Sequence, residues 1–186
     1  MPDGVQAIVL CEDLQGWVFA RRMLLAMGYE NGRIRLSRYK YPAKGGGGSG
    51  EQHVRERYPD ELRAYRPRAA RTKTTLVVLT DADKLTVPQR RKTLEDALEK
   101  KALAPRGPEE RVALLVPKWE IETWIHFFLD GTTVDEDRKD YPKYEDHEAD
   151  AAPAAETFGQ HARQATTPAQ APPSLVTGLI EARRAL

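Results

Sequence analysis

Four short apolar segments alternate with helix-forming segments, and this alternation constrains the fold more than any other feature of the chain. The apolar segments are residues 5–11, 33–37, 75–80 and 112–116. All but the second are nearly continuous apolar runs, which are typical of strands buried on both faces of a parallel sheet. Helical apolar spacing follows them in residues 14–27, 51–64, 86–101 and 119–129. The repeated β-α order predicts an α/β fold with a Rossmann-like, mainly parallel central sheet flanked by helices.

The composition of the chain changes after residue 130. Residues 130–150 contain nine acidic residues against three basic ones, and residues 151–173 are rich in Ala, Pro, Gln and Thr. Helices are predicted near residues 151–164 and 174–186. We therefore expect residues 1–130 to form the α/β domain. Residues 131–186 are expected to form an acidic loop and a C-terminal helical extension packed on that domain.

Composition and cysteine content indicate the class of protein. Hydrophobic residues make up 40% of the 186 residues and charged residues 31%, so a packed core can form. No apolar run reaches the roughly 18 residues that a membrane span requires. The first residues lack the basic and apolar regions of a signal peptide. A single cysteine, Cys11, leaves no intramolecular disulfide and no cysteine-based zinc site. These features predict a cytoplasmic protein that does not contact a membrane.

Acidic residues follow three of the four expected strands. The carboxyl ends of parallel strands meet at one edge of a sheet, where α/β proteins bind their ligands. Several carboxylates in one crevice do not all stay ionised without a cation, and carboxylate oxygens suit Mg²⁺ or Mn²⁺. The predicted metal ligands are Glu12, Asp81, Asp83, Glu120 and Glu122.

One or two metal ions at this edge would support phosphodiester hydrolysis, because they activate water and stabilise the leaving oxygen. Glu12 or a metal-bound water would transfer the proton, and Lys118 would stabilise the negative charge of the transition state. Lys84 is a second candidate for the role of Lys118. The same acids also have an ordinary structural interpretation, since acidic residues often cap helices and turns after strands.

The acidic motifs and their order resemble the Toprim domain of topoisomerases, primases and the overcoming-lysogenization-defect (OLD) nucleases. The resemblance rests on a strand ending in Glu12, a later strand ending in Asp81-Ala82-Asp83, and the βα alternation between them. The segment Pro117–Ile125 is similar to the one after the next strand in OLD-like and small stand-alone Toprim proteins. The resemblance covers about residues 5–130. It implies a Toprim-like fold and a Mg²⁺-dependent nuclease, in a phage-defence or mobile-element system.

A basic stretch indicates nucleic acid as the partner. Residues 33–73 contain twelve Lys and Arg against four acids, although the whole chain has a net charge of only +1. Tyrosines interleave these cations, as contacts to a nucleic-acid backbone and its bases would favour. A solvated helix face explains the same pattern. We expect DNA rather than RNA, bound by Arg38, Lys40, Lys44, Arg55, Arg68 and Arg71.

Two other functions fit the same residues. The chain could be a non-catalytic or partner-dependent Toprim-like subunit of a larger complex, for example with an ATPase subunit, and metal binding would then be absent. It could instead be a receiver-like or phosphatase-like protein with Asp81 as the nucleophile. That alternative gives no role to Glu120 and Glu122.

Overall fold

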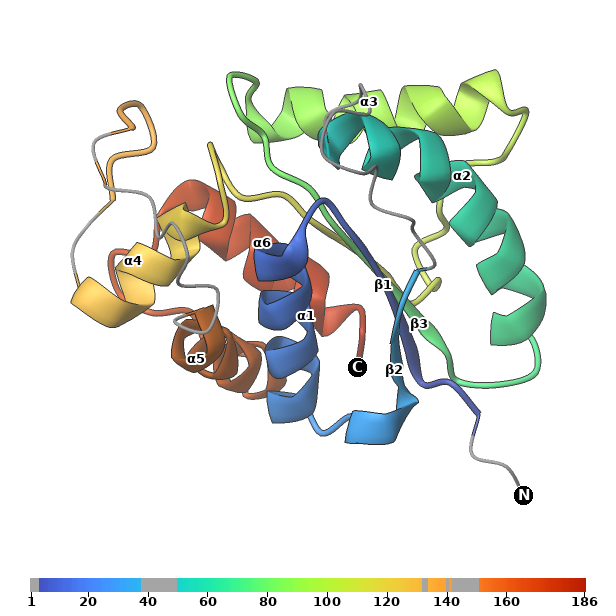
Figure 1. Cartoon of the computed structure of the whole chain (residues 1–186), viewed down its shortest axis with the longest axis horizontal. Helices are drawn as coiled ribbons and strands as arrows, with labels where there is room; N and C mark the ends of the chain where they lie inside the picture. The colour runs from blue at the N-terminus through green and yellow to red at the C-terminus, as the bar shows by residue number, and fades with distance from the viewer. Residues whose placement is uncertain (1–3, 38–49, 132–133, 140, 142–150) are drawn as a thin grey trace.

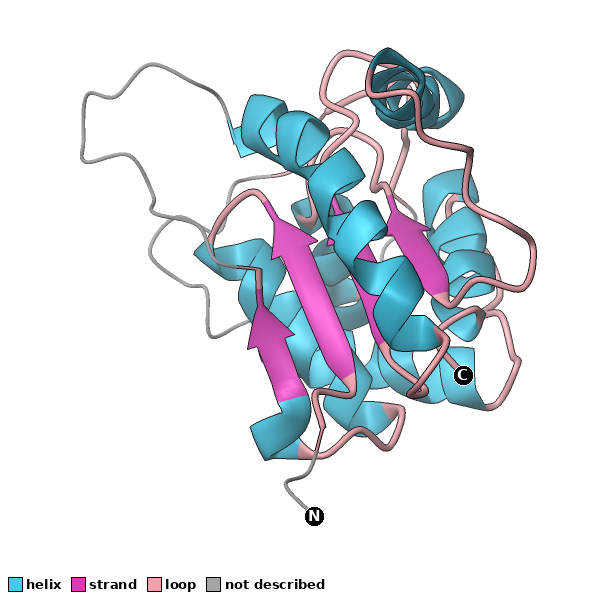
Figure 2. Ribbon diagram, turned by 90° about the vertical axis from the view of Figure 1, so that its right-hand side faces the viewer, coloured by secondary structure: helices cyan, strands magenta, loops and turns pink. Residues whose placement is uncertain are grey.

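A four-stranded sheet forms the centre of the molecule, with strand order β2-β1-β3-β4 and every pairing parallel. The computed structural model describes residues 4–37, 50–131, 134–139, 141 and 151–186. The strands are β1 (Ala7–Cys11), β2 (Ile34–Leu36), β3 (Thr75–Leu79) and β4 (Val112–Leu115). Their arrowheads point the same way in Figure 2. The α/β fold predicted from the sequence is confirmed.

Helices cover both faces of this sheet. They are α1 (Leu14–Ala26), the short 3-10 helix η1 (Asn31–Arg33), α2 (Gly50–Ala69), α3 (Val87–Lys100), α4 (Glu122–Asp130), α5 (Ala151–Arg163) and α6 (Pro173–Arg183). Figure 1 shows α2 and α3 on one side of the sheet and α1, α4, α5 and α6 on the other. Within the described part of the chain, no helix has both the length and the apolar character needed to cross a membrane.

Alternating strand residues divide the core into two apolar clusters. In β1, Ala7 and Val9 pack into the cluster that contains the helices α1, α4, α5 and α6. Ile8 and Leu10 pack into the cluster beneath α2 and α3. Successive side chains of a strand point to opposite faces, so a strand buried on both sides must be apolar throughout. This explains why β1, β3 and β4 are nearly continuous apolar runs, whereas the edge strand β2 contains the exposed Arg35.

The C-terminal helices belong to the first of these clusters. Trp124 of α4 is fully buried, and its ring stacks on Phe158 of α5 with 5.2 Å between centroids. The indole Nε1 of Trp124 donates a hydrogen bond to Ser174 Oγ of α6 over 2.8 Å. One aromatic residue therefore joins three helices that the sequence places after the strand-rich part of the chain.

The helix α2 is longer than the sequence predicts. The basic composition of residues 66–73 is typical of a linker, but the helix continues to Ala69. Tyr65 lies in the core near its end, and the Tyr65 hydroxyl accepts a hydrogen bond from the backbone N–H of Arg111. Arg66 Nε also donates to Glu110 Oε1 over 2.7 Å. These contacts hold the last helical turn, and sequence-local patterns do not reveal them.

The helix α4 also begins later than the sequence predicts. The apolar spacing predicts a helix from Trp119, whereas α4 starts at Glu122. Trp119 has φ 63°, in the left-handed region of the backbone map, which is incompatible with a right-handed helix. Glu120 therefore lies in the connection before the helix, and Glu122 lies in its first turn.

We expect Gly159→Ala to lower the free energy of unfolding by about 1–3 kcal/mol, because α5 and α1 leave no room for a side chain. A Cβ at Gly159 would lie 2.5 Å from the backbone oxygen of Met23 and 2.8 Å from Cβ of Ala26. Urea unfolding followed by circular dichroism measures the change. Gly32→Ala is the matched control, since a Cβ there meets nothing within 4 Å. Equal stability of the two variants would contradict this packing.

Candidate active site

The strand order places a topological switch point between β1 and β3. The chain passes from β1 to β2 on one side and later returns to β3 on the other side of β1. Ligands of open α/β sheets bind in the crevice outside the carboxyl ends of the strands at such a point. Glu12 directly follows β1, and Thr80 and Asp81 directly follow β3. The sheet therefore brings two of the predicted site residues to the place where ligands bind.

Glu12 and Asp81 are in direct contact at this edge. Glu12 Oε1 accepts a hydrogen bond from Thr80 Oγ1 over 2.5 Å and another from the backbone N–H of Asp81 over 2.8 Å. The start of α2 closes over Glu12, since a Cβ on Gly50 would lie 2.8 Å from Glu12 Cβ. A side chain at position 50 would therefore displace the glutamate.

Both carboxyl groups of this pair have raised pKa values. Burial raises the pKa of Glu12 to about 7, and the charges of Asp83 and Asp13 add to this against the hydrogen bonds from Thr80 and Asp81. Burial raises the pKa of Asp81 well above its usual range, and the neighbouring charge of Glu12 is the next cause. Two neighbouring negative charges in a partly buried site therefore favour a nearby proton or cation.

We expect Glu12→Gln to stabilise the protein increasingly as the pH rises from about 4.5 to about 7. Glu12 binds its proton more tightly in the folded protein, because its pKa rises from 4.5 to about 7. The wild-type protein therefore loses stability over this interval, whereas glutamine does not titrate and keeps an oxygen for Thr80. Urea unfolding at several pH values measures the difference. A constant difference at every pH would contradict the raised pKa.

The guanidinium of Arg90 lies beside these acids, although the sequence pattern did not predict Arg90 as a site residue. Its side chain is only 7% exposed and pairs with Glu51 Oε1 at 2.6 Å and Asp83 Oδ2 at 3.1 Å. Its Nε donates to the backbone oxygen of Asp81 over 2.8 Å. The sequence signal for Arg90 is its place one turn after Thr86, which caps α3. Because the adjacent Arg91 carries the same charge, this signal does not distinguish Arg90 from its neighbour.

Asp83 and Trp119 hold two loops of the site together. They form an isolated antiparallel bridge, in which the Asp83 N–H donates to the Trp119 backbone oxygen over 2.9 Å. Both residues are left-handed, with φ 51° for Asp83 and 63° for Trp119. This conformation is unfavourable for a bulky side chain such as tryptophan, and such strain concentrates at functional sites. The bridge fixes the loop after β3 against the loop after β4.

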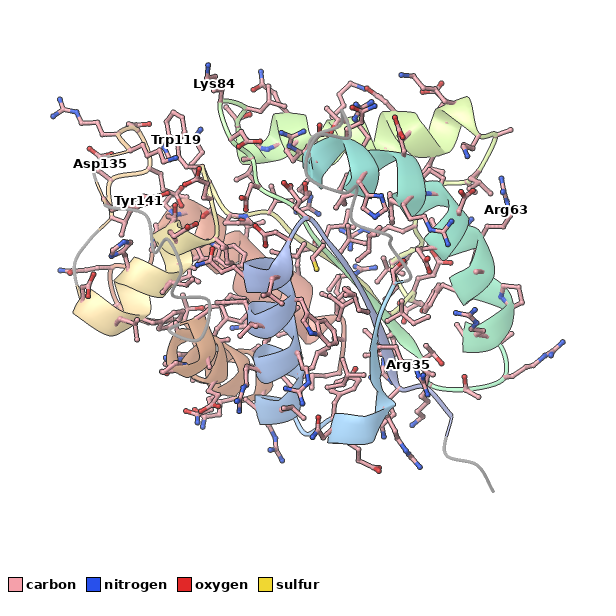
Figure 3. The ribbon with its side chains drawn as sticks, in the orientation of Figure 1. Arg35, Arg63, Lys84, Trp119, Asp135 and Tyr141 are labelled. Atoms are coloured by element: carbon pink, nitrogen blue, oxygen red, sulfur yellow. The ribbon has the colours of Figure 1, made fainter. Side chains whose placement is uncertain are left out.

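Lys118 supports the same two loops. Its Nζ donates to the backbone oxygens of Asp83 over 3.0 Å and Leu85 over 2.9 Å. It also lies 3.7 Å from the centroid of the Trp119 ring. Lys118 would have to leave these contacts to reach a reacting phosphate, so its catalytic role stays a prediction. Lys84 is exposed, and Figure 3 shows it at the tip of its loop, directed away from the molecule.

The two glutamates after β4 have different surroundings. Glu122 is buried in the first turn of α4, and its charge contributes to the raised pKa of Asp81. Glu120 instead pairs with Lys139, with 2.6 Å between Oε1 and Nζ. Figure 3 shows Tyr141 in this neighbourhood, and its hydroxyl lies 2.7 Å from Thr123 Oγ1. The charge of Glu122 thus acts on Asp81, whereas Glu120 pairs with Lys139 of the segment after α4.

The positions of these acids fit a cation that is bound by only a small number of protein side chains. In the described residues, no group of three or more His, Cys, Asp or Glu side chains has the spacing of a complete metal centre. Mg²⁺ is usually bound through one or two carboxylates and keeps several waters. Glu12 and Asp81 supply such a pair, and the repulsion between them is what a cation would relieve. The five-carboxylate site expected from the sequence stays a prediction.

The predicted nucleic-acid ligands are placed only in part. Arg38, Lys40 and Lys44 lie outside the described residues. Arg55 on α2 pairs with Glu51, with 3.0 Å between Nε and Oε1. Arg68, in the last turn of α2, and Arg71, just after it, are exposed.

Comparison with known proteins identifies no relative. No family model, no curated protein and no solved structure matches the chain. The function proposed next therefore rests on the chemistry of the Glu12–Asp81 pair and its neighbours.

Proposed function

We propose that the protein is a metal-dependent phosphodiesterase of the Toprim-like nuclease type, acting on nucleic acid and on DNA rather than RNA. The observation that carries this proposal is the contact between Glu12 and Asp81 at the topological switch point. Two partly buried carboxyls with raised pKa values, at the edge where α/β sheets bind ligands, favour a bound cation. An acidic residue that only capped a helix or a turn would not need to be removed from solvent in this way.

The residues around the pair have distinct roles in this proposal. Mg²⁺ or Mn²⁺ held by Glu12 and Asp81 would supply positive charge and lower the pKa of a bound water. Glu12 is suited to accept and return a proton near neutral pH, since its pKa is about 7. Thr80 and the Asp81 N–H orient its carboxyl. Arg90 positions Asp83 beside them.

A cleavage assay with metal tests the proposal directly. Purified protein is incubated with plasmid, single-stranded DNA and RNA, in Mg²⁺, in Mn²⁺ and in a chelator. We expect cleavage of DNA with either metal and none in the chelator. Calorimetric titration with Mn²⁺ provides a second readout, which Asp81→Asn should abolish. Failure to bind Mn²⁺ and failure to cleave any substrate would together overturn the proposal.

A second candidate is a partner-dependent subunit with an incomplete site. One observation favours it, since the protein's own cations already engage two predicted metal ligands. Arg90 pairs with Asp83, and Lys139 pairs with Glu120. In this case the isolated chain would not bind Mn²⁺ and would act only with a partner, such as an ATPase subunit of a cytoplasmic phage-defence complex. Co-purification of a partner without metal binding would favour this alternative.

A further inference from the structure

A groove of about 500 Å³ lies between the edge strand β2 and the helix α2. Its lining includes the apolar side chains of Val5, Ile8 and Leu36 and the hydroxyl side chains of Ser37, Thr72 and Thr74. Three arginines, Arg35, Arg57 and Arg68, line it from the strand and from the helix. None of these arginines contacts the Glu12–Asp81 pair. The groove is thus a separate feature of the fold.

The positive charge of this groove is largely uncompensated. Glu61 is its only acidic side chain among the described residues, and it is already engaged. Glu61 Oε1 accepts from Ser37 Oγ over 2.6 Å and from Arg57 Nε over 3.2 Å. Arg35 and Arg68 are exposed, and neither guanidinium has an ion pair within the described part of the chain. The two guanidinium groups therefore remain available for an anion.

A second pocket extends this basic surface. It has a volume of about 460 Å³, borders Gly4, Val5 and Thr72 like the first, and is lined by further cations. These cations are Arg33, Lys73 and Arg111. The two adjoining pockets together are lined by six cationic side chains, of which Arg57 pairs with Glu61 and Arg33 with Glu30. A single small anion would not need a surface of this extent.

We propose that this groove binds the phosphates of a nucleic-acid strand, with Arg35 and Arg68 as its main contacts. Guanidinium groups match phosphate oxygens through paired hydrogen bonds. The proposal deepens the proposed function and rests on it for the identity of the strand as substrate. It assigns the binding surface to Arg35, which the sequence pattern did not single out.

The direction of α2 connects the groove to the acidic pair. Gly50, at the start of the helix, touches Glu12, whereas Arg68 lies in its last turn. The 20 residues of α2 span about 30 Å at 1.5 Å per residue. A strand that follows the helix from Arg68 would therefore extend over several nucleotides toward the edge that carries Glu12.

Fluorescence anisotropy with a labelled single-stranded DNA oligonucleotide, measured in a chelator, tests this groove without cleavage. We expect Arg35→Gln and Arg68→Gln each to weaken binding by about 3- to 10-fold at moderate salt. Each should also lower the slope of log affinity against log salt by about 0.7 for every phosphate that the variant no longer neutralises. Thermal unfolding should show that both variants fold, because both side chains are exposed and make no ion pair in the described structure.

Arg63→Gln is the matched control. Arg63 lies on the same helix and its substitution removes the same charge, but it pairs with Asp60 and does not line the groove. Figure 3 shows it on the outer side of α2, away from Arg35. An equal loss of affinity in all three variants would overturn the groove, as would a wild-type protein that does not bind the oligonucleotide. Binding only to an acidic protein partner would overturn it as well.

The groove and the proposed nuclease can fail separately. Asp135→Asn should bind the oligonucleotide as the wild-type protein does, because Asp135 lies outside both the groove and the acidic pair. If the wild-type protein binds the oligonucleotide through the groove but shows no metal-dependent cleavage, the proposed binding surface is supported and the proposed nuclease activity is contradicted. If Arg35→Gln and Arg68→Gln leave cleavage at limiting substrate unchanged, the proposed binding surface is contradicted and the proposed nuclease activity is supported.

Discussion

Asp81→Asn is expected to reduce metal-dependent cleavage by about 100- to 1,000-fold while leaving the protein at least as stable as the wild type. Asparagine has the same shape but lacks the negative charge that holds a cation, and loss of one electrostatic contributor typically costs about 100- to 1,000-fold. Single-turnover cleavage at saturating Mg²⁺ measures the first effect. Loss of the ligand should lower the rate even at high metal concentration.

The stability of this variant separates a lost site from a lost fold. Burial and the charge of Glu12 raise the pKa of Asp81 in the folded protein. An acid with a raised pKa lowers stability as the pH rises from its unfolded pKa toward its folded pKa. At neutral pH, Asp81→Asn should therefore unfold at the same urea concentration as the wild type or at a higher one. Unchanged cleavage in this variant would remove Asp81 from the site.

The matched control for cleavage is Asp135→Asn. Asp135 is an acidic residue of the segment after α4, and Figure 3 shows it at the edge of the molecule. Its removal changes the net charge by the same amount as the removal of Asp81. We expect wild-type cleavage from this variant, so a comparable loss would indicate a nonspecific charge effect.

Glu181→Gln is expected to lower the free energy of unfolding by about 3 kcal/mol at neutral pH, because it leaves two arginines without their partner. Glu181 of α6 is 5% exposed. Its carboxylate pairs with Arg91 at 2.7 Å and Arg106 at 2.6 Å, and it accepts the backbone N–H of Leu114 in β4 over 3.0 Å. Urea unfolding measures the loss, with the denaturant midpoint as the readout.

The pH dependence of this effect has a defined sign. Burial alone would raise the pKa of Glu181, but hydrogen bonds from Arg106 and Leu114 and the charges of Arg106 and Arg91 lower it. A carboxyl with a lowered pKa stabilises the fold above its unfolded pKa, and this contribution disappears as the pH falls through the folded pKa. The difference between wild type and variant should thus be largest near neutral pH and vanish in acid.

Glu156→Gln is the control for Glu181. Glu156 pairs with Arg22 at 3.4 Å, and its side chain is 48% exposed. Exposed pairs contribute about 0–1 kcal/mol, so this substitution should shift the urea midpoint only slightly. A small effect at both positions would show that α6 is not held to β4 and α3 through Glu181.

The strands and the acids after them could be predicted from local patterns. Residues 76–79 and 112–116 are apolar throughout because they are buried on both faces, and this leaves a clear signal in the sequence. Glu12 and Asp81 could be placed at one edge because parallel strands share their carboxyl edge. Their direct contact follows from the pairing of β1 with β3, which the strand spacing in the sequence does not specify.

Other parts of the site depend on contacts between distant residues. Arg90 lies among three arginine and lysine positions in a row, and only the fold turns its side chain toward Asp83 and Glu51. The last turn of α2 exists because Tyr65 and Arg66 reach partners more than 40 positions away. A local pattern carries no information about such partners.

The amino-acid sequence by itself determined the β-α alternation, the parallel sheet and the acidic residues at its carboxyl edge, since burial and chain direction act on neighbouring residues. The tertiary structure decided which acids lie together, which are neutralised by Arg90 and Lys139, and where uncompensated arginines such as Arg35 lie. These depend on electrostatic and packing contacts across strands and helices. Their energies are set by distance and burial in three dimensions rather than by position along the chain.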